Sequence, residues 1–376
     1  MRILLTTDTI GGVWTFTREL SAGLLRRGHT VALISFGRLP SPEQCEWITS
    51  TEGEYGSSFF YEGSATPLEW MRTNSDAYVD ALPLLLRIVG EFRPDVLHTS
   101  QFCFGRLPIS LPKIVTAHSD VFSWASACKP SGLEVSEWLV RYRSLVQDGL
   151  DGADAVVAPT RWMLRALGES FKLRAAEHVI FNGRDLGTAA TTEARTMQAI
   201  STGRVWDEAK NVALLNEVDS PMPILVVGDV EHDGTHAPSS SGSVSYLGVL
   251  AEGELLSLLH RSSIYIASSI YEPFGLALVE AALCGCAIVA NDLDSFREIW
   301  GNAVLYFHHA EDLGQLLKHL HASPKVLESA QRKACLRAGA YTGSRMAEAY
   351  VSLYASLLRG DGRVAGSMEG LVPDAF

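Results

Sequence analysis

The sequence predicts an α/β protein built from two successive parallel-sheet halves, each a doubly wound, Rossmann-like domain. Its length of 376 residues exceeds what one ordinary hydrophobic core holds. Near the amino terminus, an apolar strand over Ile3–Thr6 is followed by Gly11-Gly12. A helix from about residue 15 to residue 27 then leads to a strand over Thr30–Phe36. The same alternation restarts at Ile224, after a polar stretch from residue 185 to residue 199.

Short apolar runs bounded by turn residues complete both halves. In the first half we expect strands over Val96–His98, Ile114–Ala117, Ala155–Ala158 and Val179–Phe181. In the second half we expect strands over Ile224–Val227, Val244–Leu247, Ile264–Ala267 and Ala287–Ala290, and helices over Glu252–His260 and Ala310–His321.

These elements predict an N-terminal domain over residues 1–187 and a C-terminal domain over residues 188–343, with a central cleft between them. The remaining region, 344–376, holds one more helical pattern, about Ser344–Leu358, and a glycine-rich tail. That helix is open to packing on either domain, including back on the N-terminal one. The tail from Gly360 onward has few apolar residues, so we expect it to fray.

Composition and charge exclude several classes of function. The net charge is −12, and neither half has a basic excess, which argues against nucleic acid as a partner. A small basic patch for peripheral membrane contact stays open, but no apolar run is long enough to span a bilayer. The six cysteines show no Cys-x-x-Cys spacing, and the first residues start a strand rather than a signal peptide. We therefore expect a cytoplasmic protein, either free or at the inner face of the membrane.

The most informative segment runs from Glu272 to Glu280 and places two carboxylates eight residues apart. A Pro-Phe-Gly turn lies between them, and an apolar helical run follows and ends at Cys284-Gly285. The helix is expected to begin near Phe274, where free backbone N–H groups favour an anion. Carboxylates on both sides of a phosphate site suit a nucleotide sugar, which has hydroxyl groups at both ends. The alternative is that Glu272 is an ordinary acid at a helix start, but Glu280 in an apolar run needs a partner.

Other candidate residues are weaker signals alone. Arg204 and Lys210 form a cationic pair that could neutralise a diphosphate leaving group, or a charged turn paired with Asp207 and Glu208. Gly11-Gly12 allows backbone to approach a ligand, although no Gly-x-Gly-x-x-Gly fingerprint is present.

Two further features each have an ordinary structural alternative. His118 follows an expected strand, where site residues gather, yet on the residues alone a structural histidine is the more common interpretation of that place. Glu231, His232, Asp233 and His236 faintly resemble a metal site. Their loop is rich in glycine, proline and serine and offers no scaffold to fix a ligand geometry, so no metal is expected.

Together these motifs resemble the retaining glycosyltransferases of the GT-B fold, glycosyltransferase family 4. The resemblance covers nearly the whole chain. It rests on Glu272-x7-Glu280, Gly203-Arg204 with Lys210, Ile180–Gly183, Val226–Asp229, Tyr246–Gly248 and His118. One departure is Asp292–Ser295, where the family often has a Gly-Gly pair.

The resemblance implies transfer of a hexose from a UDP-, GDP- or ADP-hexose to a sugar or lipid-linked acceptor, without a metal or other cofactor. It assigns catalytic roles to His118, Glu272, Arg204 and Lys210. The donor would contact Gly11, Gly12, Arg204, Lys210, Gly228, Leu247, Glu272, Pro273, Phe274, Gly275, Leu276 and Glu280. Within this set Glu272 faces the hexose and Glu280 the ribose. Asp120 and Trp124 are candidate acceptor contacts.

Two alternatives remain beside a transferase. A GT-B sugar-nucleotide epimerase is one, although that class lacks the Glu-x7-Glu pattern with its Pro-Phe-Gly turn. A non-catalytic sugar-nucleotide binder is the other, and retention of both cations and both glutamates argues against it. The oligomeric state is not indicated by the sequence.

Overall fold

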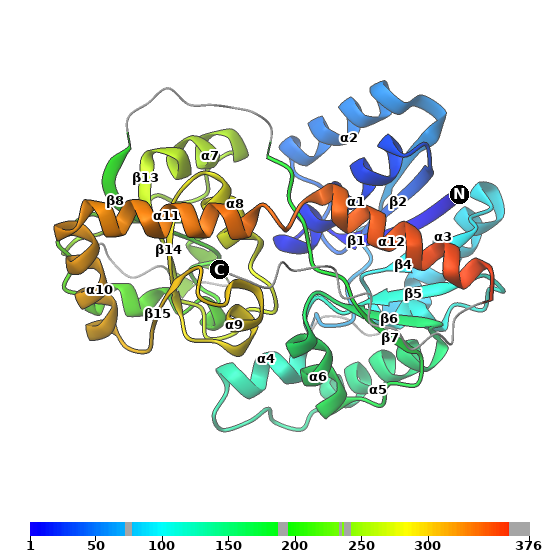
Figure 1. Cartoon of the computed structure of the whole chain (residues 1–376). Helices are drawn as coiled ribbons and strands as arrows, with labels where there is room; N and C mark the ends of the chain where they lie inside the picture. Colours follow the sequence, from blue (N-terminus) through cyan, green and yellow to red (C-terminus); the bar gives the residue numbers. More distant parts are fainter. Residues whose placement is uncertain (72–76, 187–194, 233–234, 237–241, 361–376) are drawn as a thin grey trace. The chain divides into compact units, whose positions relative to one another are not determined.

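The computed structural model describes residues 1–71, 77–186, 195–232, 235–236 and 242–360 (Figure 1). The chain divides into two compact units. The first contains residues 1–123, 131–183 and the segment from Gly343 on, and the second contains residues 124–130 and 184–342. The expected tail beyond Gly360 lies outside the described residues, as does Asp233 in the histidine-containing loop. No described helix is long and apolar enough to cross a membrane.

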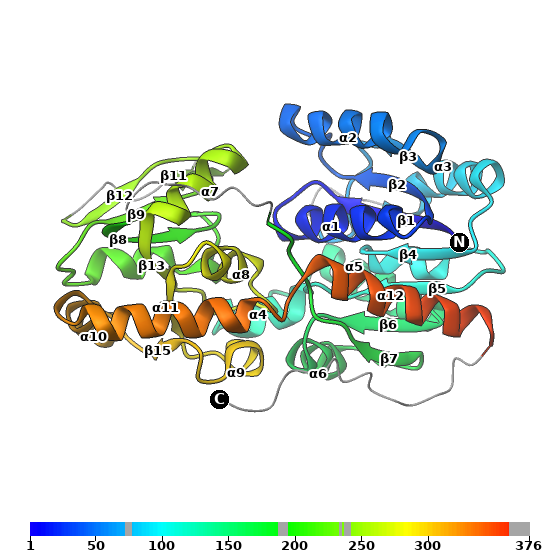
Figure 2. The same cartoon turned by 45° about the horizontal axis from the view of Figure 1, so that its top comes forward.

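The first unit is a parallel sheet flanked by helices (Figure 2). Its strands lie in the order β3-β2-β1-β4-β5-β6-β7. They are β1 (Arg2–Asp8), β2 (Thr30–Phe36), β3 (Phe59–Gly63), β4 (Val96–Thr99), β5 (Lys113–Thr116), β6 (Ala155–Ala158) and β7 (Ala176–Val179). Its helices are α1 (Gly12–Arg26), α2 (Pro42–Tyr55), α3 (Ala77–Phe92), α5 (Glu137–Gly152), α6 (Arg161–Ser170) and α12 (Gly343–Leu358). Helix α4 (Val121–Cys128) begins in this unit.

The order of the strands reverses at β1, which pairs with β2 on one side and β4 on the other. Such a switch point at the carboxyl ends of parallel strands is where open α/β sheets bind ligands. Gly11 lies there, just before α1, and Gly12 is the first residue of that helix. The predicted βαβ unit is therefore confirmed, with a helix that begins at Gly12 rather than near residue 15.

The last helix, α12, belongs to the first unit and is anchored to it by buried polar groups. The Tyr354 hydroxyl lies 2.7 Å from Nδ1 of His98, and the Tyr350 ring stacks on the His98 ring at 4.7 Å between centroids. The other His98 nitrogen lies 2.7 Å from Thr116 Oγ1. Burial lowers the pKa of His98 to about 3, with the charge of His118 as a lesser cause, so the ring is neutral.

The second unit holds another parallel sheet, in the order β12-β9-β8-β13-β14-β15. Its strands are β8 (Thr196–Thr202), β9 (Ile224–Val227), β12 (Val244–Tyr246), β13 (Ser262–Ala267), β14 (Ala287–Asn291) and β15 (Leu305–Phe307), beside a two-stranded ribbon of β10 (Glu231–His232) and β11 (Thr235–His236). Its helices are α7 (Glu252–Arg261), α8 (Leu276–Leu283), α9 (Asp294–Trp300), α10 (Ala310–Ala322) and α11 (Pro324–Ala338). Two parallel-sheet, Rossmann-like domains were predicted, and this fold class is confirmed.

The strand β8 is the main element that was not predicted from the sequence. It lies between β9 and β13 in the sheet, yet its residues are Thr-Met-Gln-Ala-Ile-Ser-Thr. Its polar side chains are satisfied by neighbours that are distant in sequence, as when Thr202 Oγ1 contacts the Tyr265 hydroxyl at 2.9 Å. The edge strand β3 was also missed, and the strand expected over Val179–Phe181 is β7, which ends at Val179.

Candidate active site

The carboxyl ends of β8 and β9 meet at two glycines, Gly203 and Gly228. Their φ angles are 151° and 150°, a backbone region that favours glycine. A Cβ atom on Gly228 would lie 1.8 Å from the carbonyl oxygen of Gly203. A Cβ on Gly203 would instead press on the Lys210 side chain, at 3.2 Å from Cδ. The two glycines therefore allow strand ends and a lysine stem to approach closer than any side chain permits.

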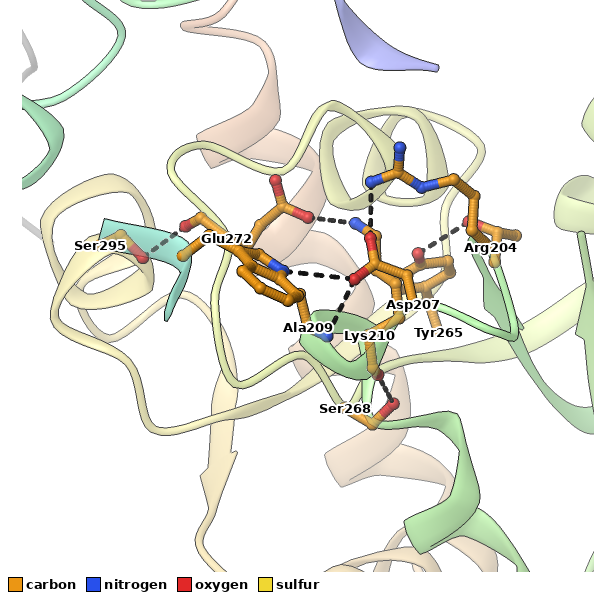
Figure 3. Close-up of polar contacts among 10 residues, drawn as sticks. Arg204, Asp207, Ala209, Lys210, Tyr265, Ser268, Glu272 and Ser295 are labelled. Carbon is orange, nitrogen blue, oxygen red and sulfur yellow. Dashed lines mark hydrogen bonds and ion pairs between the residues drawn. The ribbon is translucent and has the colours of Figure 1, made fainter. Parts of the chain in front are cut away.

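Lys210 and Glu272 form the central contact of this region (Figure 3). The Lys210 ammonium donates to Glu272 Oε2 at 2.5 Å, although 62 residues separate the two. Lys210 ends the short 3-10 helix η3 (Glu208–Lys210), and its carbonyl oxygen accepts from the Ser268 hydroxyl at 2.8 Å. The Glu272 carbonyl oxygen accepts from the Ser295 hydroxyl at 2.6 Å. The backbone of each charged residue is thus fixed by a serine from another element.

Arg204 follows β8 and is paired differently from Lys210. Its Nη2 donates to Asp207 Oδ2 at 2.5 Å, and its guanidinium lies 5.2 Å from the centre of the Trp206 ring. Asp207 also accepts from the Ala209 amide at 3.0 Å, so it organises the turn that leads to Lys210. Of the charged-turn alternative, only the pairing of Arg204 with Asp207 is found. Glu208 pairs with Lys129 at 2.6 Å.

The Pro-Phe-Gly turn leads into α8 as expected. Gly275 has a φ of 88° and precedes the first helical residue, Leu276. The Phe274 side chain is buried, with its ring against Tyr341 at 5.6 Å between centroids, so this residue presents backbone rather than side chain to a ligand. The first amides of a helix have no intrahelical acceptor. The amides of Leu276 and Ala277, at the start of α8, are accordingly suited to hold an anion.

Glu280 lies on α8 in an otherwise apolar run, and its partner is Arg184. The Arg184 Nε donates to Glu280 Oε1 at 2.7 Å, and its Nη2 bonds to Glu252 at the start of α7. The sequence predicted that Glu280 needs a partner but did not find this one. No local signal links residues that are 96 positions apart, so only the fold could reveal the pair.

In the first unit, His118 follows β5. Its Nε2 lies 3.3 Å from Ser100 Oγ, and its ring meets Phe16 edge-on at 4.5 Å between centroids. Burial lowers the pKa of His118 to about 3, which keeps the ring neutral at physiological pH. A neutral imidazole can donate one hydrogen bond and accept another, as recognition of a hydroxyl requires.

The two glycines after β1 leave backbone exposed. Gly11 has a φ of 60° and precedes α1, and a Cβ on either Gly11 or Gly12 would meet no atom within 4 Å. The space beside them is open to a ligand, so steric crowding by the protein does not explain glycine at these positions.

The remaining candidates are placed as follows. Asp120 is buried and caps α4, since Oδ1 accepts from the Phe122 amide at 2.8 Å and Oδ2 from the Ser123 hydroxyl at 2.5 Å. Burial raises its pKa above the ordinary value. The Trp124 Nε1 donates to Asp207 at 3.5 Å. Leu247 is 42% exposed directly after β12, level with the last residue of the neighbouring strand β9.

Metal-ligating side chains do not gather in the part of the chain that the structure describes: it holds no group of three or more His, Cys, Asp or Glu residues suited to a cation. Asp292, in the segment Asp292–Ser295 that departs from the expected Gly-Gly pair, accepts two bonds from Arg297 at 2.6 and 2.7 Å. This pairing lowers the Asp292 pKa.

Comparison with known proteins agrees with this architecture. A family model described as Glycosyltransferase Family 4 matches residues 10–188, and one described as Glycosyl transferases group 1 matches residues 210–335. The phosphatidyl-myo-inositol mannosyltransferase of Mycolicibacterium smegmatis is 31% identical over 317 residues, which span 78% of this chain and 75% of that protein.

Solved structures share the fold at low identity. Sucrose-phosphate synthase from Thermosynechococcus elongatus has a TM-score of 0.72 at 16% identity, covering 96% of this chain and 100% of that chain. Anabaena Alr3699/HepE in complex with UDP-glucose has a TM-score of 0.68 at 14% identity, covering 95% and 100%.

The two Rossmann-like units and these matches define a glycosyltransferase of the GT-B fold. Within that class, the chain belongs to glycosyltransferase family 4.

Proposed function

We propose that this glycosyltransferase moves a hexosyl group from a nucleoside diphosphate hexose to an acceptor hydroxyl, with retention of the anomeric configuration. The observation that carries the proposal is the Lys210–Glu272 pair in the second unit, together with the start of α8 that follows Glu272. A single domain therefore holds three groups suited to such a donor. Lys210 is a cation for phosphate, Glu272 is a carboxylate for sugar hydroxyls, and the start of α8 offers backbone amides.

The leaving diphosphate is the group that most needs stabilisation. As the glycosidic bond to phosphate breaks, negative charge grows on the phosphate oxygens. Lys210, Arg204 and the first amides of α8 can neutralise that charge. In the structure, Lys210 is paired with Glu272 and Arg204 with Asp207. Donor phosphates would take over the ammonium of Lys210, which frees Glu272 to accept hydrogen bonds from hexose hydroxyls.

The second unit would hold the rest of the donor. We assign Glu280 to the ribose hydroxyls, Gly228 and Leu247 to the surroundings of the base, and the turn over Pro273–Leu276 to phosphate and sugar through backbone groups. UDP-glucose is bound by the structural neighbour Alr3699/HepE, which supports a nucleotide-sugar donor here. UDP-, GDP- and ADP-hexoses are the candidates.

We assign acceptor binding to the N-terminal domain, residues 1–187, and donor binding to the C-terminal domain, residues 188–343. His118 is suited to a hydrogen bond with the hydroxymethyl group of the reacting hexose, and Gly11-Gly12 to close approach of backbone to donor or acceptor. Asp120 already caps α4, so its contribution to an acceptor site would be through the placement of that helix. Trp124 offers an aromatic face for an acceptor sugar.

Retention follows from attack on the face that the leaving group vacates. The phosphate oxygen that departs can take the proton of the acceptor hydroxyl, so that no protein carboxylate acts as a nucleophile. Glu272 and Glu280 then bind substrate rather than flank the scissile bond, as the carboxyl pair of a hydrolase does. The proposed reaction needs no metal, because the positive charges of Lys210 and Arg204 can neutralise the leaving diphosphate as a divalent ion would.

The acceptor is proposed to be a sugar or a lipid-linked molecule, with the enzyme in the cytoplasm or in peripheral contact with the inner face of a membrane. The similarity to a phosphatidyl-myo-inositol mannosyltransferase supports a lipid-linked acceptor as one candidate. Vesicles with and without phosphatidylinositol would separate it from free sugars.

A panel of UDP-, GDP- and ADP-hexoses tests the proposal directly. Release of nucleoside diphosphate is measured with and without acceptors extracted from cells, and the sugar is analysed afterwards. Release that depends on acceptor supports transfer. Interconversion of the sugar without release would indicate an epimerase instead, and binding without any turnover would indicate a non-catalytic binder.

Substitution of the two glutamates should affect different properties, nucleotide affinity for one and turnover for the other. Glu280→Ala is expected to weaken nucleotide binding by about tenfold or more, because hydrogen bonds to a charged group are lost. Glu272→Ala is expected to lower turnover with a much smaller effect on nucleotide affinity, because its contacts are to the hexose. Isothermal titration gives the affinities and product release gives the rates. Unchanged nucleotide affinity in Glu280→Ala would contradict the ribose assignment.

A further inference from the structure

Arg184 carries a charge that is almost wholly buried, with 5% of its side chain exposed. It lies in the second unit and reaches two acids on different helices. Its Nε donates to Glu280 on α8 at 2.7 Å, and its Nη2 bonds to Glu252, the first residue of α7. Only 17% of the Glu280 side chain and 35% of the Glu252 side chain are exposed.

Stability alone does not explain such a group. Burying an ion pair removes both charges from water, and apolar residues of similar size stabilise a core equally well or better. Helix α8 reads Leu-Ala-Leu-Val-Glu-Ala-Ala-Leu, so an apolar residue at position 280 would suit it. The charges at 184 and 280 therefore call for a reason beyond packing.

The geometry offers that reason. A carboxylate in an apolar helix tends to become protonated or to turn toward water unless a cation holds it. The Arg184 guanidinium supplies that cation, and its bond to Oε1 fixes one oxygen of Glu280 in place. An ionised, fixed carboxylate is the acceptor that a pair of ribose hydroxyl groups needs.

We propose that Arg184 is a positioning residue for ribose recognition, holding the Glu280 carboxylate oriented toward the nucleotide. The inference rests on the proposed function, because it presumes that Glu280 binds ribose. Arginine suits the task and lysine does not, since a planar guanidinium can bond two carboxylates at once in fixed directions.

The main chain of Arg184 is anchored to a residue that packs against the turn before α8. Its amide donates to the Tyr341 carbonyl oxygen at 3.0 Å, and the Tyr341 ring packs against Phe274 in the turn before α8. The Tyr341 hydroxyl donates to the Ile299 carbonyl oxygen at 2.5 Å. The guanidinium is therefore extended from a fixed backbone, as a positioning role requires.

The test is a ratio of affinities rather than an affinity. Dissociation constants are measured for UDP and 2′-deoxy-UDP, with the ADP and GDP pairs as further probes, and the base that binds best is used. The wild-type protein should bind the ribonucleotide about tenfold more tightly than its deoxy counterpart. Arg184→Met should bring that ratio close to one while the affinity for the deoxynucleotide changes little. Arg184→Lys should give an intermediate ratio, because it retains the charge but not the two-way contact.

A matched control separates this role from a general loss of stability. Arg195, in the same unit, donates to the backbone carbonyl oxygens of Ser262 and Cys284 at 2.6 Å each, rather than to the carboxylates of Glu280 and Glu252. Arg195→Met should lower the thermal unfolding temperature without changing the ratio. Glu252→Gln removes one anchor of Arg184 and should reduce the ratio in part. If Arg184→Met does not fold, Arg184→Lys and Glu252→Gln provide the same readout.

The outcomes distinguish this inference from the function on which it rests. If Glu280→Ala loses the preference for ribose and the Arg184 variants keep it, the positioning role is overturned and the ribose role of Glu280 stands. If Glu280→Ala keeps the preference, the ribose assignment fails and the inference with it. If the wild-type protein binds no nucleotide, the proposed function itself is overturned.

Discussion

Replacing Glu69 with glutamine is expected to remove a large part of the pH dependence of the first unit's stability. Glu69 is buried, and its Oε1 accepts from the Phe102 amide at 2.8 Å while the Cys103 thiol faces its Oε2 at 3.8 Å. Burial is the main cause that raises the pKa of Glu69 to about 7, with the charge of Asp8 as a further cause. Hydrogen bonds from Phe102 and Cys103 act in the opposite direction.

The magnitude follows from the two pKa values. The ordinary value for the unfolded chain is 4.5, and the folded value is about 7. At pH values between these two pKa values, Glu69 stays protonated in the folded state but ionises in the unfolded state. The folded protein is therefore most stable at low pH, and it loses stability as the pH rises from about 4.5 to about 7. Each pH unit corresponds to about 1.4 kcal/mol, so this carboxyl group lowers the free energy of unfolding by about 3 kcal/mol by neutral pH.

Glu69→Gln keeps an oxygen that can accept from the Phe102 amide but cannot ionise. We expect the variant to match the wild type near pH 4 and to exceed it by about 3 kcal/mol near pH 8. The protein is equilibrated in urea at several pH values. The unfolded fraction is then measured with a short hydrogen-exchange pulse that is always given at the same pH. Peptides over residues 96–106 are monitored, because two units need not unfold together.

The comparison of variant with wild type cancels the effects of other titrating groups. Glu46→Gln, an exposed acid on α2, serves as the control and should leave the wild-type pH dependence unchanged. Equal slopes of stability against pH in the wild type and Glu69→Gln would refute the reasoning.

Two other substitutions probe the site and the fold. Gly228→Ala places a methyl group against a carbonyl oxygen, so we expect a loss of about 1–3 kcal/mol in stability and weaker nucleotide binding, by calorimetry. Gly253→Ala on α7, where a Cβ meets open space, is the control, and equal behaviour of the two variants would contradict the close approach. Tyr354→Phe leaves the buried His98 nitrogen without its hydroxyl partner and should cost about 1–3 kcal/mol in urea unfolding, whereas no change would mean that α12 is held by apolar contacts alone.

Much of the fold was readable from the sequence because its signals are local. An apolar strand followed by glycines and an amphipathic helix specifies a βαβ unit within some thirty residues, as β1, α1 and β2 show. The start of α8 was equally readable, since the Pro-Phe-Gly turn and Cys284-Gly285 mark both of its ends. Prediction from local signals was wrong at β8. Its polar residues are typical of a loop, and they form a strand because it pairs with β9 and β13.

The candidate site divides along the same line. The sequence by itself determined which residues could act, because carboxylates, cations and glycines at set spacings are properties of short segments. Only the tertiary structure decided which distant residues meet: Lys210 with Glu272, and Glu280 with Arg184. The physical reason is that the fields and hydrogen bonds that orient a charged side chain act across space. In the second unit, loops after β8 and β13 bring together residues that lie 62 positions apart in the chain.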